Sequence, residues 1–209
     1  MSEFISLTFG KISGRHGNVV ATVSKSTGKT HLRIYNPPSN PRTPKQMAVR
    51  EKFSMVNKEM RPFRALFKIT FGGNDGVRKA ISLVFRTAIA GEYKTYKIDY
   101  TKLIISEGAL NTACTPSATK TAANTIKVEW DYTEDFYGIN PNDSVNLIFY
   151  NEITKELLFK QSVSLRNIET VDNTMPEVWI GSKIHCYIYF TTADGKTNSI
   201  SQYISEVQL

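Results

Sequence analysis

The first part of the chain alternates apolar and polar residues over two short stretches. Asn18–Lys25 and His31–Tyr35 show the period of two that is typical of β-strands, with Ser26–Lys29 between them. Gly28 stands where a tight turn needs a positive φ angle, which glycine adopts at no steric cost. The pattern therefore predicts a β-hairpin.

A proline-rich connector follows and ends in a helix start. Residues 36–41 contain three prolines, which remove backbone donors and disfavour a helix. Thr43 can then act as N-cap, Pro44 suits the first helical position, and Gln46 completes a capping box. Four apolar residues at helical spacing predict one buried stripe before Pro62: Val49, Phe53, Val56 and Met60.

A second helix is predicted over Gly76–Ala90. Asn74 or Asp75 would cap its start, and Gly91 would end it. Its apolar face consists of Val77, Ile81, Val84, Phe85 and Ala88. We expect the two helices to pack on the hairpin and to bury a modest core with it.

From Tyr93 onward the pattern changes to short strands separated by turn residues. A polar linker, Asn111–Asn124, lies between two of these strands. The predicted strands are Tyr96–Ile98, Leu103–Ser106, Thr125–Tyr132, Ser144–Tyr150, Glu156–Ser164, Lys183–Thr191 and Ser199–Val207. Such spacing is typical of a β-sandwich. Trp130, which alternates with charged residues, and Trp179 are the expected core anchors.

These patterns predict an α+β N-terminal module (a β-hairpin plus two helices) followed by an all-β immunoglobulin-like sandwich. The expected boundary gives a basic module at 1–95 and an acidic sandwich at 96–209. Charge supports this division, because residues 1–100 carry 18 Lys and Arg against 6 Asp and Glu, whereas residues 101–209 carry 8 against 13. The basic half is expected to face something acidic. Alternatively, the two halves attract each other, within the chain or between subunits.

Composition narrows the class of protein. Hydrophobic residues make up 41% of the chain, which supports a packed core. No apolar run approaches the roughly 18 residues of a membrane span. The start has no basic region and carries Glu3, so we expect no export signal and a cytoplasmic or virion-associated protein. Cys114 and Cys186 are expected to be free thiols, although one bridge between them is possible.

Motifs for catalysis or cofactor binding do not assemble. Ser24–Thr30 ends like a phosphate-binding loop, but Val23 stands where the first glycine is required and a strand follows instead of a helix. His16, His31 and His185 are scattered along the chain. There is no Gly-x-Ser-x-Gly elbow. We therefore expect no enzyme, no cofactor and no metal site.

Cations cluster around the predicted helix start. Arg42 and Lys45 flank Thr43, and Arg50 follows on the same helix. Because they oppose the helix dipole and the free N–H groups there bind anions, we expect this end to meet phosphate or a partner's carboxylates. Alternatively, Glu3, Glu51 or an acid of the C-terminal half fills that role. The full predicted anion- or partner-binding set is Arg42, Lys45, Arg50, Lys11, Arg15, Lys29 and Arg33.

Four short motifs stand in order along nearly the whole chain. They are Gly17–Val20, the S-N-P-R-T-x-x-Q-x-x-x-R-x-x-F stretch from Ser39 to Phe53, Asp99–Gly108, and Ala193–Ser199. With these motifs the chain resembles an uncharacterised bacterial family, a domain of unknown function. The resemblance implies no activity and no catalytic residue. The N-terminal pattern also resembles that of some phage-encoded structural proteins.

Three functions are compatible with this sequence. The first is a non-enzymatic structural or assembly protein, of a phage virion or another large particle, that docks through its basic module. The second is a nucleic-acid-binding accessory protein that uses the same basic face on phosphates. The third is a carbohydrate- or ligand-binding module on the sandwich, with Tyr132, Phe136 and Tyr137 as exposed aromatics. The expected partners are an acidic protein surface or nucleic acid through residues 1–95, together with other protein subunits.

Overall fold

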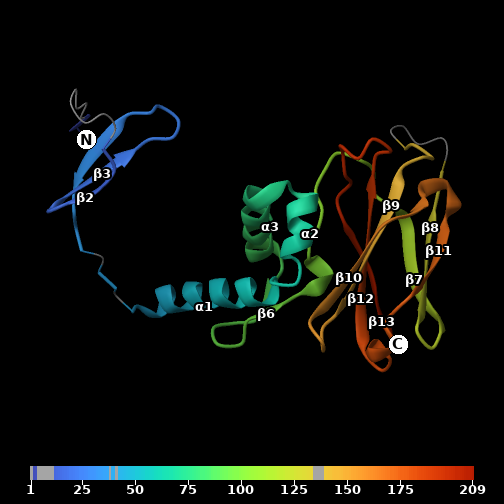
Figure 1. Cartoon of the computed structure of the whole chain (residues 1–209). Helices are drawn as coiled ribbons and strands as arrows, with labels where there is room; N and C mark the ends of the chain where they lie inside the picture. The colour runs from blue at the N-terminus through green and yellow to red at the C-terminus, as the bar shows by residue number, and fades with distance from the viewer. Residues whose placement is uncertain (1, 4–11, 38, 41, 134–138) are drawn as a thin grey trace. The chain divides into compact units, whose positions relative to one another are not determined.

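The chain folds into two compact units, residues 1–43 and 44–209 (Figure 1). The computed structural model describes residues 2–3, 12–37, 39–40, 42–133 and 139–209. The sequence placed a boundary near residue 95, but the units divide between Thr43 and Pro44. The reason is that the helices share an apolar core with the sandwich that follows them.

The first unit, called here the hairpin unit, is a small antiparallel sheet. Its strand order is β1-β4-β3-β2, with the bounds β1 Ser2–Glu3, β2 Gly14–His16, β3 Val19–Val23 and β4 Thr30–Ile34. β3 and β4 pair from Val19↔Ile34 to Val23↔Thr30. Gly28 has φ +68°, so the predicted hairpin and its glycine turn are confirmed.

The larger unit begins with three helices, of which the sequence predicted two. α1 runs over Pro44–Glu59 and starts at the predicted proline. α2, Arg64–Thr70, was not predicted; it forms after the break at Pro62 and buries Leu66, Phe67 and Thr70. Its seven residues are too few to show a clear helical period.

α3 spans Gly73–Thr87, so it begins and ends three residues before the predicted bounds. Its N-cap is Gly72, and no side chain caps it, whereas Asn74 or Asp75 was expected. Asp75 instead lies in the first turn and pairs with Arg78. Ala88 is the C-cap, and the chain then enters the short strand β5 before it reaches Gly91.

Two antiparallel sheets follow and face each other. One has the order β10-β9-β12-β13 and the other β11-β8-β7. The bounds are β7 Cys114–Ala122, β8 Thr125–Asp131, β9 Ser144–Asn151, β10 Glu156–Leu165, β11 Thr170–Thr174, β12 Lys183–Thr191 and β13 Gln202–Gln208. Trp130 and Trp179 are buried in the core between the sheets, as predicted. The arrangement is therefore sandwich-like.

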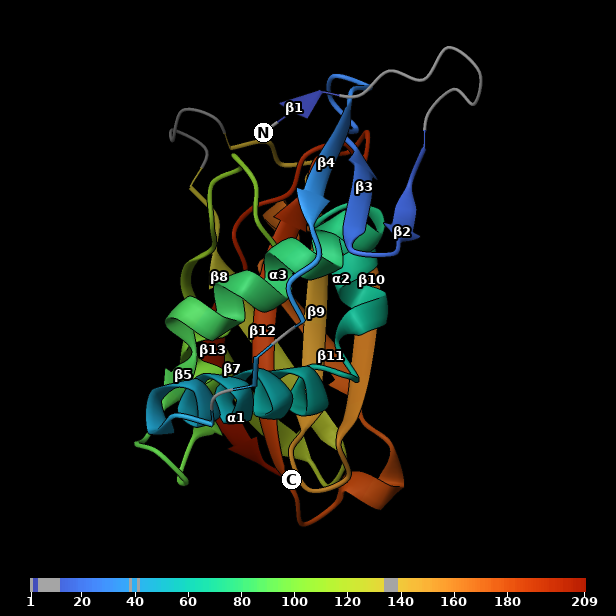
Figure 2. The same cartoon turned by 90° about the vertical axis from the view of Figure 1, so that its left-hand side faces the viewer.

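The helices cover the outer face of the four-stranded sheet (Figure 2). Val56, Met60 and Phe67 pack there with Tyr150 and Tyr187 in one buried cluster. β9 and β12 are consequently buried on both faces, which their nearly continuous runs of buried residues reflect. We expected the two helices to bury a core with the hairpin, and the structure shows that the core they bury is shared with this sheet face.

Three strand predictions differ from the structure. The linker expected at Asn111–Asn124 contains β7, and β11 was not predicted, because both are rich in Thr and other polar residues. Leu103–Ser106 is not a strand. Side-chain bonds hold this segment instead, since the Ser201 hydroxyl accepts from the Ile105 N–H at 2.7 Å. The pair β5 Ile89–Ala90 and β6 Lys97–Ile98, followed by the 3₁₀ helix η1 Tyr100–Lys102, links the helices to the sandwich.

Candidate functional site

One apolar stripe runs along α1 and ends at Met60, the residue that follows the helix, but only its second half is buried. Val56 and Met60 are fully buried against the four-stranded sheet. Phe53 and Val49, one and two turns before Val56, are each 57% exposed, and so is Ile69 on α2. Large apolar side chains gathered in this way on a surface mark an interaction site more often than scattered ones do.

These exposed side chains line an open groove between the three helices, with a volume of about 1100 Å³. Val49 and Phe53 come from α1, Ile69 comes from α2, and Val77, Ile81 and Phe85 come from α3. We call this feature the helix groove. Its lining is mostly apolar, and the α3 side chains are half-buried because they also pack against the core.

Cations surround the apolar lining. Arg64 and Lys68 of α2 and Arg78 of α3 reach the helix groove. Arg78 pairs with Asp75 at 2.9 Å, and both side chains are largely exposed, so water screens this pair. Arg64 donates to the Asn57 side chain at 3.1 Å. From residue 44 to residue 90 the sequence has ten Lys and Arg against three Asp and Glu, so the groove lies in a strongly positive region.

An apolar groove with a basic rim can bind a segment that is both apolar and acidic. Amphipathic helices bind such grooves with side chains at i, i+3, i+4 and i+7, and charges around the rim select the partner. The helix groove contains no paired carboxylates, thiol or histidine that could carry out chemistry. Its lining offers apolar contacts and cations to a bound partner.

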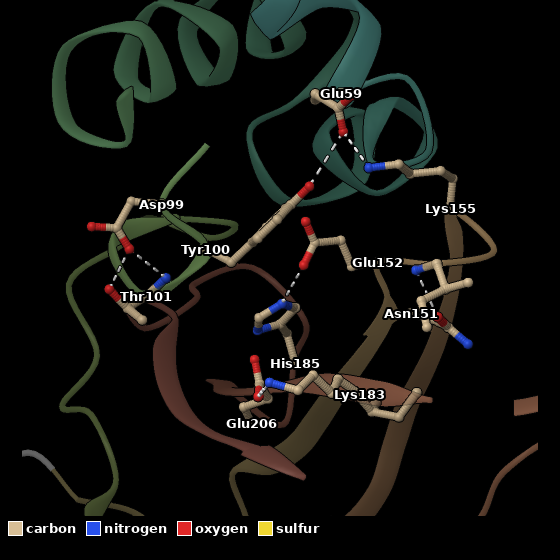
Figure 3. A network of polar contacts seen from close by, with 12 residues as sticks. Glu59, Asp99, Tyr100, Thr101, Asn151, Glu152, Lys155, Lys183, His185 and Glu206 are labelled. Carbon is tan, nitrogen blue, oxygen red and sulfur yellow. Dashed lines mark hydrogen bonds and ion pairs between the residues drawn. The ribbon is translucent and has the colours of Figure 1, made fainter. Parts of the chain in front are cut away.

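A polar network fixes the end of α1 on the sandwich (Figure 3). Glu59, in the last turn of α1, accepts from the Tyr100 hydroxyl at 3.3 Å and from the Lys155 ammonium at 2.7 Å. Burial of Lys155 lowers its pKa, but the bond to Glu59 and the charges of Glu59, Tyr150 and Glu152 together outweigh burial and raise the pKa of the lysine. Since Lys155 directly precedes β10, this contact ties the helical layer to the sheet.

His185 lies beneath this contact, on β12. Its ring stacks on Tyr100 with the centroids 4.7 Å apart, and its Nε2 lies 3.6 Å from a Glu152 carboxylate oxygen. The Tyr203 hydroxyl is 3.4 Å from Nδ1. Burial lowers the pKa of His185, although Glu152 and Glu206 partly oppose this shift. The imidazole is therefore neutral at pH 7.

A small pocket of about 190 Å³ opens beside this network. Glu59, Glu152, Lys97 and Lys155 line it together with Tyr100 and other aromatic and apolar side chains. Its two carboxylates and two ammonium groups balance in charge, and the Glu59–Lys155 ion pair already neutralises one of each. We interpret these contacts as holding α1 in place, which positions Phe53 and Val49 for the groove.

The chain matches a family of unknown function, DUF6266, over residues 11–205. The chain belongs to this family. The match includes described parts of both compact units, and it confirms the resemblance to an uncharacterised family. Comparison with curated proteins finds no match.

In this family member, the predicted anion-binding residues divide between the two units. Arg15, Lys29, Arg33 and Arg42 belong to the hairpin unit, where all four are exposed. Lys11 lies outside the described residues. Lys45 and Arg50 are exposed on α1 of the larger unit.

Of the predicted residues, Arg50 lines a hollow beside the helix groove together with Val49 and Phe53. Within the hairpin unit, the Arg15 guanidinium lies 3.7 Å from the centre of the Tyr35 ring and donates to the Gly17 carbonyl. Sequence analysis did not include Arg64, Lys68 and Arg78 among the binding residues. Their sequence positions become meaningful only once three helices are arranged around one groove.

Other classes of site find little support in the described residues. No group of three or more His, Cys, Asp or Glu there could hold a metal ion. Cys114 and Cys186 are free thiols, as expected, and burial raises the pKa of Cys186 to about 12. No described helix has the length and apolar character to cross a membrane. Of the three aromatics considered for ligand binding, Phe136 and Tyr137 lie outside the described residues.

Proposed function

We propose that this protein is a non-enzymatic docking protein whose helix groove binds an acidic, partly apolar segment of a protein partner. The observation that carries the proposal is the half-exposed stripe of α1. Leaving Val49 and Phe53 in water costs hydrophobic free energy that a partner would recover, about 25 cal/mol for each Å² covered. Such a protein would serve as a subunit or adaptor in a larger assembly, of which a phage virion is one kind.

The composition of the groove supports a protein partner over a nucleic acid. Phosphate contacts need cations but gain nothing from aliphatic side chains such as Val49 and Ile69. A partner that offers Leu or Phe together with Glu or Asp would satisfy both the apolar lining and the cations Arg64 and Lys68. The excess of basic residues on the helices also speeds encounter with an acidic partner.

The test is fluorescence anisotropy with a labelled helical peptide of about 16 residues, apolar at helical spacing and acidic on both flanks. A matched peptide with Gln in place of each Glu serves as the first control. Phe53→Ser, and separately Arg64→Gln with Lys68→Gln, should each weaken binding of the acidic peptide at least about tenfold. Lys120→Gln removes an exposed cation on β7, outside the groove, and should leave binding unchanged. Equal binding of both peptides, or full affinity in both groove variants, would contradict the proposal.

Nucleic-acid binding is the second candidate, and the hairpin unit is the observation in its favour. Its described cations Arg15, Lys29, Arg33 and Arg42 are exposed, and Arg15 already stacks on an aromatic ring. Titration of duplex DNA over a salt series would test this function. Affinity that falls steeply with salt and is lost in Lys29→Gln with Arg33→Gln would favour it over the groove.

We also infer that the sandwich is immunoglobulin-like. Its seven strands β7–β13, taken as A to G, pair in the order A-B-E in one sheet and C-F-G in the other. The fourth strand, β10, joins C instead of E, which differs from the constant-type arrangement. Backbone NOEs between β8 and β11 would check this strand order.

A further inference from the structure

One end of the sandwich presents the opposite chemistry to the helix groove. The 3₁₀ helix η3, Glu177–Trp179, and the turn between β9 and β10 both lie at the lower end in Figures 1 and 2. We call this end the acidic tip. It consists of the apolar residues Ile153, Val178 and Ile180 and the carboxylates Glu152, Glu156 and Glu177.

The apolar side chains of the acidic tip project into water. Val178 is 75% exposed, Ile153 71% and Ile180 51%. Single exposed apolar residues are common on protein surfaces, but these three belong to two neighbouring segments and therefore form a group, which is typical of an interaction site. A bond of 2.8 Å from the Trp179 indole to Glu156 joins the segments.

Buried groups hold the acidic tip in shape. Trp179 is buried in the core of the sandwich, so it anchors η3 and leaves Val178 and Ile180 facing outward. The Asn151 side chain accepts from the N–H groups of Ile153 and Thr154 and holds the turn. A surface formed in advance loses less conformational entropy on binding.

The two lysines that lie close enough to Glu152 to interact with its charge both form their ion pairs with carboxylates outside the acidic tip. Lys155 pairs with Glu59 of α1 at 2.7 Å, and Lys183 pairs with Glu206 at 2.6 Å. Glu177 is exposed and forms no ion pair within the described part of the chain. The tip is thus apolar and acidic, while the helix groove is apolar and basic.

We propose that the acidic tip of one copy docks into the helix groove of a second copy. This inference rests on the proposed function, since it names the partner that the groove receives. Val178 and Ile180 would lie against Phe53 and Ile69, and Glu177 would lie among the cations of the rim. A groove-to-groove pairing of two copies is disfavoured, because it would bring two strongly basic surfaces together.

The contact is heterologous, since two different surfaces of the same unit take part. Each bound copy then still offers a free groove or a free tip, so association continues into a ring or an open filament. A chain that assembles in this way can build a larger structure from copies of itself, without a second protein.

Sedimentation velocity of the full chain tests this assembly. Between about 1 μM and about 100 μM, at low salt, the mean mass of the wild-type chain should rise with concentration, and added salt should reduce it. Phe53→Glu blocks the groove and Val178→Lys blocks the tip, and each variant alone should stay monomeric. Ile168→Lys changes a similarly exposed residue on the 3₁₀ helix η2, at the other end of β10, and should assemble like the wild type.

Mixing the two blocked variants gives the decisive result. The intact tip of the Phe53→Glu chain should enter the intact groove of the Val178→Lys chain, and growth should stop at a 1:1 dimer. A monomeric wild type, a mixture without dimers, or association that survives both substitutions would overturn the inference. If the acidic peptide still binds while the wild type stays monomeric, the proposed function stands and only the second copy is excluded as partner. If the peptide fails as well, both proposals fail.

Discussion

The two halves of α1 have the same apolar pattern and opposite surroundings. Val56 and Met60 are sealed against the four-stranded sheet, while Val49 and Phe53 lie open in the helix groove. Helical spacing is equally regular in both halves. An apolar stripe in the sequence therefore predicts where a contact can form. Which part of the protein, or which partner, makes that contact depends on the rest of the fold.

The largest expected effect comes from removing the helical layer altogether. A fragment of residues 96–209 would expose the outer face of the four-stranded sheet, where Ile148, Tyr150, Tyr187 and Tyr189 are buried. We expect this fragment to aggregate or to bind a hydrophobic dye such as ANS, as loosely packed states do. A fragment of residues 44–209 should unfold cooperatively, as measured by circular dichroism in urea. A soluble, cooperative 96–209 fragment would show that the sandwich needs no helices.

A substitution in the core between the two sheets tests whether this core and the core beneath the helices unfold together. Trp130→Ala removes a buried ring whose indole donates to the Arg166 carbonyl at 2.7 Å, and it should cost about 3–5 kcal/mol of unfolding free energy. Because both clusters share the four-stranded sheet, the helical circular dichroism signal and the Trp179 fluorescence should change at the same urea concentration. Two separate transitions would divide the larger unit into independent layers.

A matched pair of substitutions on α1 tests the comparison directly. Met60→Ala should cost about 2–5 kcal/mol, because it leaves a cavity in a closed core. Phe53→Ala should change the unfolding free energy by no more than about 0.5 kcal/mol, since its side chain is largely in water. Urea denaturation of both variants checks this, and similar losses in the two would mean that Phe53 is part of the core.

The smallest expected effect concerns how the free energy of unfolding depends on pH through His185, which stacks on Tyr100. The pKa of folded His185 lies below the unfolded value of about 6.5, because the ring is buried. As the pH falls from about 6.5 toward the folded pKa, the unfolded chain binds a proton that the folded chain does not, so stability decreases with a slope of at most about 1.4 kcal/mol per pH unit. Above about pH 6.5 this contribution is fully present.

His185→Gln should flatten the part of the stability profile that lies just below about pH 6.5. Glu206 and Glu156 titrate at lower pH, because bonds from Lys183 and Trp179 lower their pKa values. Loss of stability near pH 4 should therefore persist in the variant. Chemical denaturation at several pH values measures both effects, and an unchanged slope just below about pH 6.5 would exclude His185 as the titrating group.

Local patterns predicted the elements that depend on local chemistry. Pro44 starts α1, Gly28 forms the hairpin turn, and the alternation around Trp130 is a half-buried strand. The polar strands β7 and β11 and the short helix α2 escaped prediction because their periodicity is weak. The domain boundary differed for another reason: charge changes near residue 95, but packing joins residues on either side of it.

The candidate site was only partly predictable. Arg50 could be selected from the sequence as a binding residue, and it lies beside the helix groove. Arg64, Lys68 and Arg78 belong to two further helices, and their convergence depends on how these helices cross α1. The acidic tip had no sequence signal, because Val178 and Ile180 flank Trp179 in an apolar run that is typical of a core.

The irregular path of β10 has a consequence for how copies of this protein can aggregate. β10 forms the edge of its sheet, and its pairing with β9 is interrupted between Lys160 and Ser164, where Ser162 has φ +50°. The Ser162 N–H donates to the Asn146 side chain, so this backbone donor has a partner within the chain although the strand pairing is interrupted there. A bulged edge is a poor template for a further strand, which protects the protein against amyloid-like growth. Copies of this protein should consequently not add to one another strand by strand along β10.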